Sequence, residues 1–463
     1  MRTLDAQALE KLRSRIRGRM IRPQDSAYDD ARRVFVGGID RRPSLIVRVA
    51  DSDDVARVVD VVREAGLELA IRSGGHSGAG HSVSDGGVVI DLRDMRALTI
   101  QAEEGTAWAE TGLTAGEYSD AAQAYGLATG FGDTGSVGIG GLTLGGGVGY
   151  LTRKHGLTID SLIAADVVTA DGTVVRADAE SNPDLYWAIR GGGGNFGVAT
   201  RFNFRLHPVG TVYGGMLMLP ATADTIASFV AAADAAPEEL TTIANIMTAP
   251  PMPFVPAAYH GKLVMFTLMV YAGALDAGER ALAPFRTIAT PIVDMLRPMP
   301  YPEIYPPEDP NYHPLAANRN LFVDAIDGQS AQTIIDHLEA TDARLRAVQV
   351  RVLGGAVSRV PAEATAYAHR TRRILVNIAA LFDRPEDATR YEAWATRFWH
   401  ALRNGEPGAY VNFLASDGPS RIHEAYPGRT LERLTAIKAR YDPTNLFRLN
   451  ENVRPEPISV ART

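Results

Sequence analysis

The sequence contains no cysteine in its 463 residues. This absence excludes disulfide frameworks, thiolate nucleophiles, iron–sulfur clusters and cysteine zinc sites, and we expect no metal site. There is also no run of about 18 apolar residues, so a membrane-spanning helix is not expected. The opening stretch 1–20 mixes charges and lacks the apolar core of about 7–15 residues that a signal peptide needs. The sequence therefore favours a cytoplasmic protein.

The charge balance narrows the class of partner. A formal net charge of −7 provides no basic surface for nucleic acid or for an anionic membrane. The hydrophobic fraction of 46% and the charged fraction of 22% are typical of a globular protein. A chain of this length is expected to form two or three domains. A small-molecule partner is thus favoured, and the sequence leaves the oligomeric state open.

The pattern of apolar residues changes near Pro208. Before it, the segments 44–50, 67–73, 87–92, 163–172 and 197–206 alternate with helical or glycine-rich stretches, which is typical of an α/β unit. A helix is expected over 52–66, with Ser52 or Asp53 as its N-cap and Gly66 at its end. After Pro208 we expect a second domain, with a helix at 221–236 and a strand at 262–273. The proline-rich segment 295–314 is expected to be an ordered loop or a lid.

Three glycine-rich stretches indicate a cofactor. They are 72–82 (RSGGHSGAGHS), 130–150 (GFGDTGSVGIGGLTLGGGVGY) and 190–197 (RGGGGNFG). Each one alone could be a tight turn, but together they would let a large anionic cofactor approach consecutive main-chain N–H groups. Gly192, Gly194 and Gly197 match G-x-G-x-x-G, yet a helix-like segment precedes them and a strand-like segment follows. This order is the inverse of a Rossmann unit, so a nicotinamide site is not expected.

These stretches carry a family resemblance over roughly 35–208 and 405–455. Together with DLYWAIRGGGGNFGVAT and GAYVNFL…YDPTNLFRLNENV, they resemble the berberine bridge enzyme-like flavin oxidases of the vanillyl-alcohol oxidase superfamily. The resemblance implies an α+β fold. It consists of a PCMH-type FAD-binding domain made of two α/β subdomains, plus a substrate domain with an antiparallel sheet covered by helices. The implied boundaries are 1–208 for the FAD-binding domain, 209–410 for the substrate domain, and 411–463 for a C-terminal segment that returns to the FAD domain.

The resemblance also implies how FAD is held. The histidine of SGGH, His76, is the implied covalent attachment site, through a ring nitrogen to the flavin 8α carbon; a plain loop histidine is the alternative. Many relatives make a second bond through cysteine, but Thr134 occupies that position here, so only the histidyl bond is possible. His81 is expected to be a structural or solvent-facing neighbour. The other implied FAD contacts are Arg72, Ser73, Gly74, Gly75 and Ser77 at the pyrophosphate, Gly135, Ser136, Gly138, Gly140 and Gly141 near the ring and ribityl chain, Gly197 and Val198 at the adenine side, and Asn450 and Asn452 from the C-terminus.

The implied chemistry is oxidation of a C–H bond of an alcohol, sugar or amine-type substrate, with hydride transfer to flavin N5. The Y-x-N element places Tyr410 and Asn412 at the flavin, and a basic role for Tyr410 requires a nearby cation or donor to lower its pKa. His369 is a further candidate. In relatives a small valine at the position of Val137 accompanies oxidase behaviour, which implies dioxygen as acceptor and hydrogen peroxide as product.

Three alternatives remain open at this point. The first is a flavin dehydrogenase or oxidative cyclase of secondary metabolism that uses another acceptor. The second is a non-catalytic flavin or ligand-binding protein in which Tyr410 is structural. The third concerns the aromatic residues of the second domain, which could simply be core residues. Those aromatic residues, which are also candidates to line a pocket, are Tyr259, Tyr301, Tyr305, Tyr312, Trp394 and Trp399.

Overall fold

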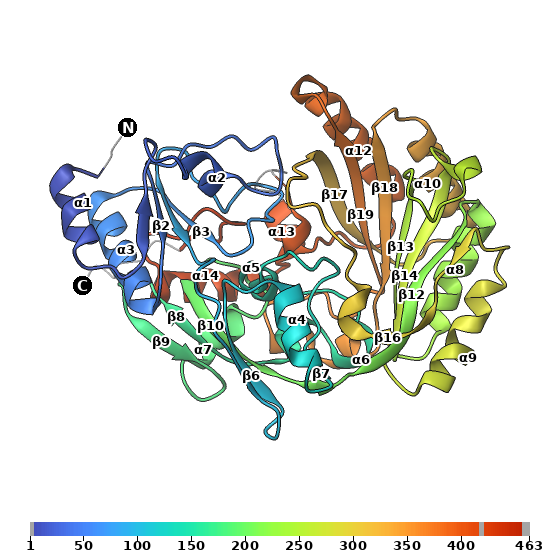
Figure 1. Ribbon diagram of the computed structural model, residues 1–463, viewed down its shortest axis with the longest axis horizontal. Coiled ribbons are helices and arrows are strands. Elements are labelled where there is room, and N and C mark those ends of the chain that lie inside the picture. The colour runs from blue at the N-terminus through green and yellow to red at the C-terminus, as the bar shows by residue number, and fades with distance from the viewer. Residues whose placement is uncertain (1–3, 416–420, 456–463) are drawn as a thin grey trace.

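The computed structural model describes residues 4–415 and 421–455 (Figure 1). The parts of the predicted segments 1–208 and 411–463 that fall at 1–3, 416–420 and 456–463 lie outside the described residues. One half of the molecule carries a four-stranded sheet, a five-stranded sheet and a short two-stranded sheet, and the other half carries an eight-stranded sheet with helices on its outer side. The predicted α+β architecture is confirmed.

The first small sheet is built from four strands, and β2, β4 and β3 run parallel. Its members in spatial order are β1 (Arg19–Ile21), β2 (Leu45–Arg48), β4 (Val88–Asp91) and β3 (Leu69–Arg72). Helix α3 (Ser52–Ala65) packs its valines against this sheet. It ends at Gly66 with a φ of 62°, as predicted. Its N-cap is Asp51, which accepts from the Asp54 N–H, so the prediction of Ser52 or Asp53 is wrong by one or two residues.

The second small sheet has five antiparallel strands. In spatial order they are β5 (Leu98–Gln101), β6 (Thr106–Glu110), β10 (Val198–Arg205), β8 (Leu162–Val168) and β9 (Val174–Ala177). The helical and short elements of this half are α1 (Ala6–Arg13), α2 (Tyr28–Arg32), α4 (Ala115–Gln123), β7 (Leu127–Ala128), α5 (Ile139–Leu144), α6 (Thr152–His155), η1 (Thr158–Asp160), α7 (Pro183–Ala188) and β11 (His207–Pro208).

The large sheet is antiparallel throughout. Its strands are β15 (Val293–Asp294), β12 (Thr211–Pro220), β14 (Leu263–Tyr271), β13 (Leu240–Thr248), β18 (Leu345–Val352), β19 (Ile374–Phe382) and β17 (Leu315–Val323), with β16 (Arg297–Pro300) also paired to β12. Its outer helices are α8 (Ala223–Ala235), α9 (Leu275–Arg286), α10 (Gly328–Glu339) and α12 (Ala388–Leu402).

Strand alternation gives this sheet two chemically different faces. On β18, Val348, Val350 and Val352 join the core under the helices, whereas Gln349 and Arg351 face the other half of the molecule. Trp394 and Trp399 of α12 also lie in the helix-side core, as the core alternative predicts, and Trp399 in addition lines a small pocket.

The proline-rich segment is more regular than predicted. Its residues Arg297–Pro300 form β16, which pairs with β12, and Tyr301–Ile304 form the 3₁₀ turn η3. Only the following stretch to β17 lacks regular structure, apart from turns. Proline is tolerated in β16 because an edge strand needs partners on one side only.

The C-terminal elements return to the first half. Helix α14 (Arg429–Tyr441) packs against α7, and it is stopped at Asp442 before Pro443. The remaining short elements are η2 (Ala257–Tyr259), α11 (Ala356–Arg359), η4 (Ala362–Ala364), η5 (Pro385–Asp387), η6 (Val411–Phe413) and α13 (Arg421–Ala425). Among the described residues, no helix has the length and apolar character needed to cross a membrane.

Candidate active site

The loop after β3 presents a row of free main-chain donors. From Ser73 to Ala79, no main-chain N–H makes a hydrogen bond to another described residue. Gly75 adopts a left-handed conformation with a φ of 79°, which turns successive N–H groups toward one side. Such a concave row of donors fits the pyrophosphate of FAD.

Two glycines let this loop cross the second glycine-rich stretch. A Cβ on Gly74 would lie 2.3 Å from the Gly138 nitrogen, and a Cβ on Gly138 would lie 2.2 Å from the Gly74 nitrogen. Ser73 fixes the crossing, since its Oγ donates to the Thr111 carbonyl (2.6 Å) and accepts from the Gly140 N–H (3.2 Å). The structure thus brings the predicted FAD contacts at 73–77 and 135–140 together. A Cβ on Gly141 would meet nothing within 4 Å, so the main chain there is open to a flat ring.

The imidazole of His76 lies at this crossing. It stacks on Phe35 with ring centroids 4.6 Å apart and an interplanar angle of 19°. Its Nε2 is 3.0 Å from Ser136 Oγ. Burial lowers the pKa of His76, opposed by the Glu308 carboxylate and Ser136. A lowered pKa favours the neutral imidazole, which is the form that can act as a nucleophile.

The neighbouring basic side chains are structural. Arg72 is buried and donates to the Ala31 carbonyl, and burial together with the nearby Arg93 lowers its pKa to about 10. His81 is largely buried rather than solvent-facing, and burial and Arg41 lower its pKa to about 4. The predicted contact of the Arg72 main chain with FAD stays a prediction.

The third glycine-rich stretch is joined to the C-terminal segment. Asn450 Nδ2 donates to the Gly194 carbonyl (3.1 Å), and Asn195 Nδ2 donates to the carbonyl of Glu451 (3.1 Å). The Oδ1 atoms of Asn450 and Asn452 are buried and accept no hydrogen bond from the described residues. These two acceptors fit the polar groups of a bound nucleotide.

Gly197 has a packing role of its own. A Cβ there would lie 2.6 Å from Val167, so this glycine lets β10, which starts at Val198, begin close against β8.

A fully buried lysine holds the C-terminal turn in place. Lys438 Nζ donates to Asp442 Oδ2 (2.7 Å), to the Asn195 carbonyl (2.7 Å) and to the Phe447 carbonyl (2.8 Å). Lys438 and Asp442 are both completely shielded from solvent. The hydrogen bond from Lys438 to the Asn195 carbonyl connects α14 to the glycine-rich loop, and sequence reasoning missed this lysine.

Tyr410 lies where the two halves meet. Its Oη accepts from the Gly147 N–H (2.9 Å) and from Asn412 Nδ2 (2.9 Å). Its main-chain N–H donates to Asn320 Oδ1 (2.7 Å) on the large sheet. The first half and the large sheet therefore both position this tyrosine.

The glycines at 145–147 make room for this pair. A Cβ on Gly145 would lie 2.0 Å from Asn412 Oδ1, and a Cβ on Gly146 would lie 3.3 Å from the Tyr410 ring. Asn412 Nδ2 also donates to the Leu142 carbonyl (2.9 Å), which fixes the amide orientation. Some of the glycines that the sequence analysis attributed to the cofactor therefore leave space for the side chains of Tyr410 and Asn412.

Opposing effects act on the pKa of Tyr410. Burial is the largest and raises the pKa, whereas the Gly147 and Asn412 donors and the Arg351 guanidinium lower it. The cation required by the sequence argument is therefore present as Arg351, on β18. Arg351 is itself paired with Asp133 (2.7 Å) and donates to the Val148 carbonyl (2.8 Å). Sequence reasoning missed Arg351 and Asp133, since 218 residues separate them.

His369 does not contact Tyr410. Its ring is buried against Phe322, with centroids 4.7 Å apart, and Tyr367 lies between it and Tyr410, with centroids 6.0 and 6.1 Å away. Burial lowers the pKa of His369 to about 4. The catalytic role of His369 stays a prediction.

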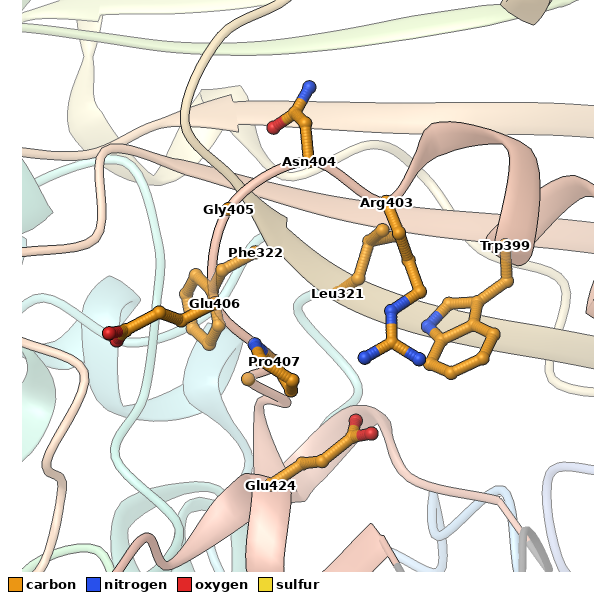
Figure 2. A pocket seen from close by; sticks show the side chains of 10 residues that line it. Leu321, Phe322, Trp399, Arg403, Asn404, Gly405, Glu406, Pro407 and Glu424 are labelled. Carbon is orange, nitrogen blue, oxygen red and sulfur yellow. The ribbon is translucent and has the colours of Figure 1, made fainter.

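A shallow pocket with room for little more than a water molecule lies beside Phe322 and the loop after α12 (Figure 2). It shares Phe322 and Gly408 with the surroundings of His369, but it contains neither His76 nor Tyr410. Its lining residues are Leu321, Phe322, Trp399, Arg403, Asn404, Gly405, Glu406, Pro407, Gly408 and Glu424.

Comparison with known proteins identifies this arrangement. Residues 43–178 match the family described as FAD binding domain, and residues 409–454 match the family described as Berberine and berberine like. The chain is 30% identical to (R)-6-hydroxynicotine oxidase of Paenarthrobacter nicotinovorans, with 95% of this chain and 97% of that protein aligned. The chain belongs to the berberine bridge enzyme-like FAD-linked oxidoreductases. The predicted family, the FAD cofactor and the assignment as an enzyme are confirmed.

Other members of the berberine bridge enzyme-like family have similar sequences and structures. Xylooligosaccharide oxidase of Thermothelomyces thermophilus is 27% identical, with 90% of this chain and 88% of that protein aligned. The crystal structure of 6-hydroxy-D-nicotine oxidase from Arthrobacter nicotinovorans superposes with a TM-score of 0.84 at 27% identity, covering 95% of this chain and 98% of that one. The similarity thus extends across both halves of the molecule.

Proposed function

We propose that this protein is an FAD-dependent oxidase acting on an alcohol, sugar or amine-type small molecule. In this proposal FAD is attached covalently through His76 alone, and Thr134 precludes a second bond. When bound, FAD accepts a hydride from a substrate C–H bond at N5 and is reoxidised by dioxygen to release hydrogen peroxide. Residues 1–208 with 411–463 hold the cofactor, and residues 209–410 bind the substrate.

One observation carries the proposal: Tyr410 Oη receives two N–H donors at the junction of the halves, beside Arg351. Both donors point at the oxygen that would bear the negative charge of a phenolate. Such a group can remove the hydroxyl proton of a substrate while the hydride leaves. Because burial raises the pKa of Tyr410, the base is scarce at neutral pH and becomes abundant in alkaline solution.

The inner face of the large sheet favours a neutral, hydroxyl-bearing substrate. Asn245, Gln349, Asn377 and Asn320 occupy one row across β13, β18, β19 and β17. Carboxamides both donate and accept, which suits hydroxyl groups. Gln349 Nε2 donates to Asp133 Oδ2 (3.1 Å), so the row reaches the residues around Tyr410. Relatives named for hydroxynicotine and xylooligosaccharides are compatible with such a substrate.

The test is a screen of alcohols, sugars and amines for peroxide release. We expect at least one class to release peroxide, and Tyr410→Phe to reduce turnover by about a hundredfold or more. Val137 is partly buried against the core, and its small side chain favours dioxygen as the acceptor because the family resemblance associates valine at this position with oxidase behaviour. Slow reoxidation of the reduced enzyme by oxygenated buffer would instead identify a dehydrogenase or cyclase. Unchanged turnover in Tyr410→Phe would refute the role of Tyr410 as base.

A further inference from the structure

A carboxylate from the second half of the chain reaches the predicted attachment site. Glu308 lies on the segment between η3 and β17, and 172 residues separate it from Ser136. Its Oε1 accepts from the Ser136 N–H (3.3 Å), and its Oε2 accepts from Ser136 Oγ. Ser136 Oγ in turn lies 3.0 Å from His76 Nε2. Glu308, Ser136 and His76 thus form a continuous hydrogen-bonded chain.

We propose that Glu308 and Ser136 are positioning residues that orient and deprotonate His76 for its attachment to FAD. The inference rests on the proposed covalent link through His76. It assigns a role to Glu308, which the glycine-rich motifs do not contain, and a second role to Ser136.

The direction of each hydrogen bond follows from the number of protons. An ionised carboxylate only accepts, so Ser136 Oγ–H must donate to Glu308. A serine hydroxyl has a single proton, and its oxygen can therefore only accept from His76. The proton of the neutral imidazole is consequently on Nε2, and the lone pair is on Nδ1. Nδ1 makes no hydrogen bond with the described residues, which leaves it as the atom that bonds to the flavin.

The attachment step balances with dioxygen as the only co-reactant. One C–H bond of the flavin 8-methyl group and the Nε2–H bond of His76 break, and the bond from Nδ1 to the methyl carbon forms. The electron pair of the broken C–H bond reduces the flavin ring, which keeps one proton. The Nε2 proton passes through Ser136 to Glu308. Dioxygen then takes the two electrons and two protons and becomes hydrogen peroxide.

Phe35 complements this chain of hydrogen bonds. It stacks on the imidazole at an interplanar angle of 19°, so the ring cannot rotate away from Ser136 without losing the stacking contact. The ring plane and the proton position are therefore fixed by different residues, and the loss of Glu308 should leave the ring in place.

Glu308→Gln is the decisive variant. The glutamine amide can donate to Ser136 Oγ, which would make Ser136 donate to His76 and move the imidazole proton to Nδ1. Full-length variants, purified with FAD bound, are incubated in aerobic buffer with added FAD. The flavin that stays in the acid-precipitated protein, and the mass of the His76 peptide, are followed over time and across pH. We expect the attachment rate to fall about a hundredfold in Glu308→Gln and Ser136→Ala, with recovery in Ser136→Thr, which keeps a hydroxyl.

Glu303→Gln is the matched control, because Glu303 is an exposed carboxylate in the preceding turn η3, where it pairs with Arg297 (2.7 Å). If Glu308→Gln attaches flavin at the same rate as the parent protein and Glu303→Gln, the proposed proton transfer through Ser136 to Glu308 (the relay) is refuted, but the covalent link stands. If the parent protein holds no acid-stable flavin, the covalent link itself fails. Loss of non-covalent FAD binding in Glu308→Gln, or no recovery in Ser136→Thr, would also overturn the relay.

Discussion

Substituting Asn412 with alanine tests the stabilisation of a Tyr410 phenolate. The substitution removes one of the two N–H donors to Tyr410 Oη, at 2.9 Å, and leaves the Gly147 donor in place. A hydrogen bond to a charged acceptor contributes about 1.5–3 kcal/mol, compared with about 0.5–1.5 kcal/mol for a neutral one. The phenolate therefore loses about 1–1.5 kcal/mol more than the phenol. The ionised fraction of Tyr410 should fall about five- to tenfold.

The assay is anaerobic mixing of the enzyme with a substrate identified by peroxide release, followed through bleaching of the flavin. Because burial raises the pKa of Tyr410, the rate in the parent enzyme should increase with pH through the neutral and alkaline range. In Asn412→Ala the rate should be about five- to tenfold lower on this rising limb, and the curve should be displaced to more alkaline pH.

Asn404→Ala is the matched control. Asn404 is on an outer loop, where its Oδ1 accepts from the Asp324 N–H (2.8 Å) and its Nδ2 donates to the Ala325 carbonyl (3.0 Å). Its loss should not alter the pH profile. An equal reduction at every pH in Asn412→Ala, or a rate independent of pH in the parent enzyme, would refute a phenolate base.

Three further perturbations test the packing around the site. Gly145→Ala places a Cβ 2.0 Å from Asn412 Oδ1, so flavin reduction should be slower while FAD stays bound, and Gly328→Ala, where a Cβ meets nothing within 4 Å, should have no effect. Lys438→Met leaves Asp442 buried without its cation, so urea denaturation should show a loss of about 3–5 kcal/mol in unfolding free energy, and the exposed Lys11→Met should change it by less than about 0.5 kcal/mol. Burial holds the pKa of the stacked His155 and His207 at about 3 and about 4, below the ordinary 6.5. As the pH decreases from about 6.5 toward 4, these histidines therefore bind protons in the unfolded chain but not in the folded one, and the free energy of unfolding should fall. His207→Gln should make this decrease less steep, which denaturation at several pH values would measure.

The sequence predicted those helices and strands that are determined by neighbouring residues in the chain. Helix α3 was predictable from its valine spacing and from Gly66, and only its cap was misplaced, because Ser52, Asp53 and Asp51 are all good capping residues. The strand β16 was not predictable, since its prolines disfavour a strand unless the neighbouring β12 leaves an edge free.

The residues of the candidate site were likewise predictable only where a short motif contains them. His76, Tyr410 and Asn412 lie in short motifs that the sequence displays. Arg351 and Glu308 act on these residues across the junction of the halves, and no local pattern marks either of them. Their roles depend on register in the large sheet and on the path of the segment after η3.

Both hydrogen-bonded groups at the site need the two halves to be packed together. Tyr410 takes one Oη donor from Gly147 in the first half, and its own N–H is held by Asn320 on the large sheet. His76 belongs to the first half, whereas its carboxylate partner Glu308 comes from the second. Separation of the halves would therefore remove at once the orientation of His76, the proposed attachment site, and of Tyr410, the proposed base. Flavin attachment and substrate oxidation should consequently respond together to changes in this junction, but independently to Glu308→Gln and Asn412→Ala.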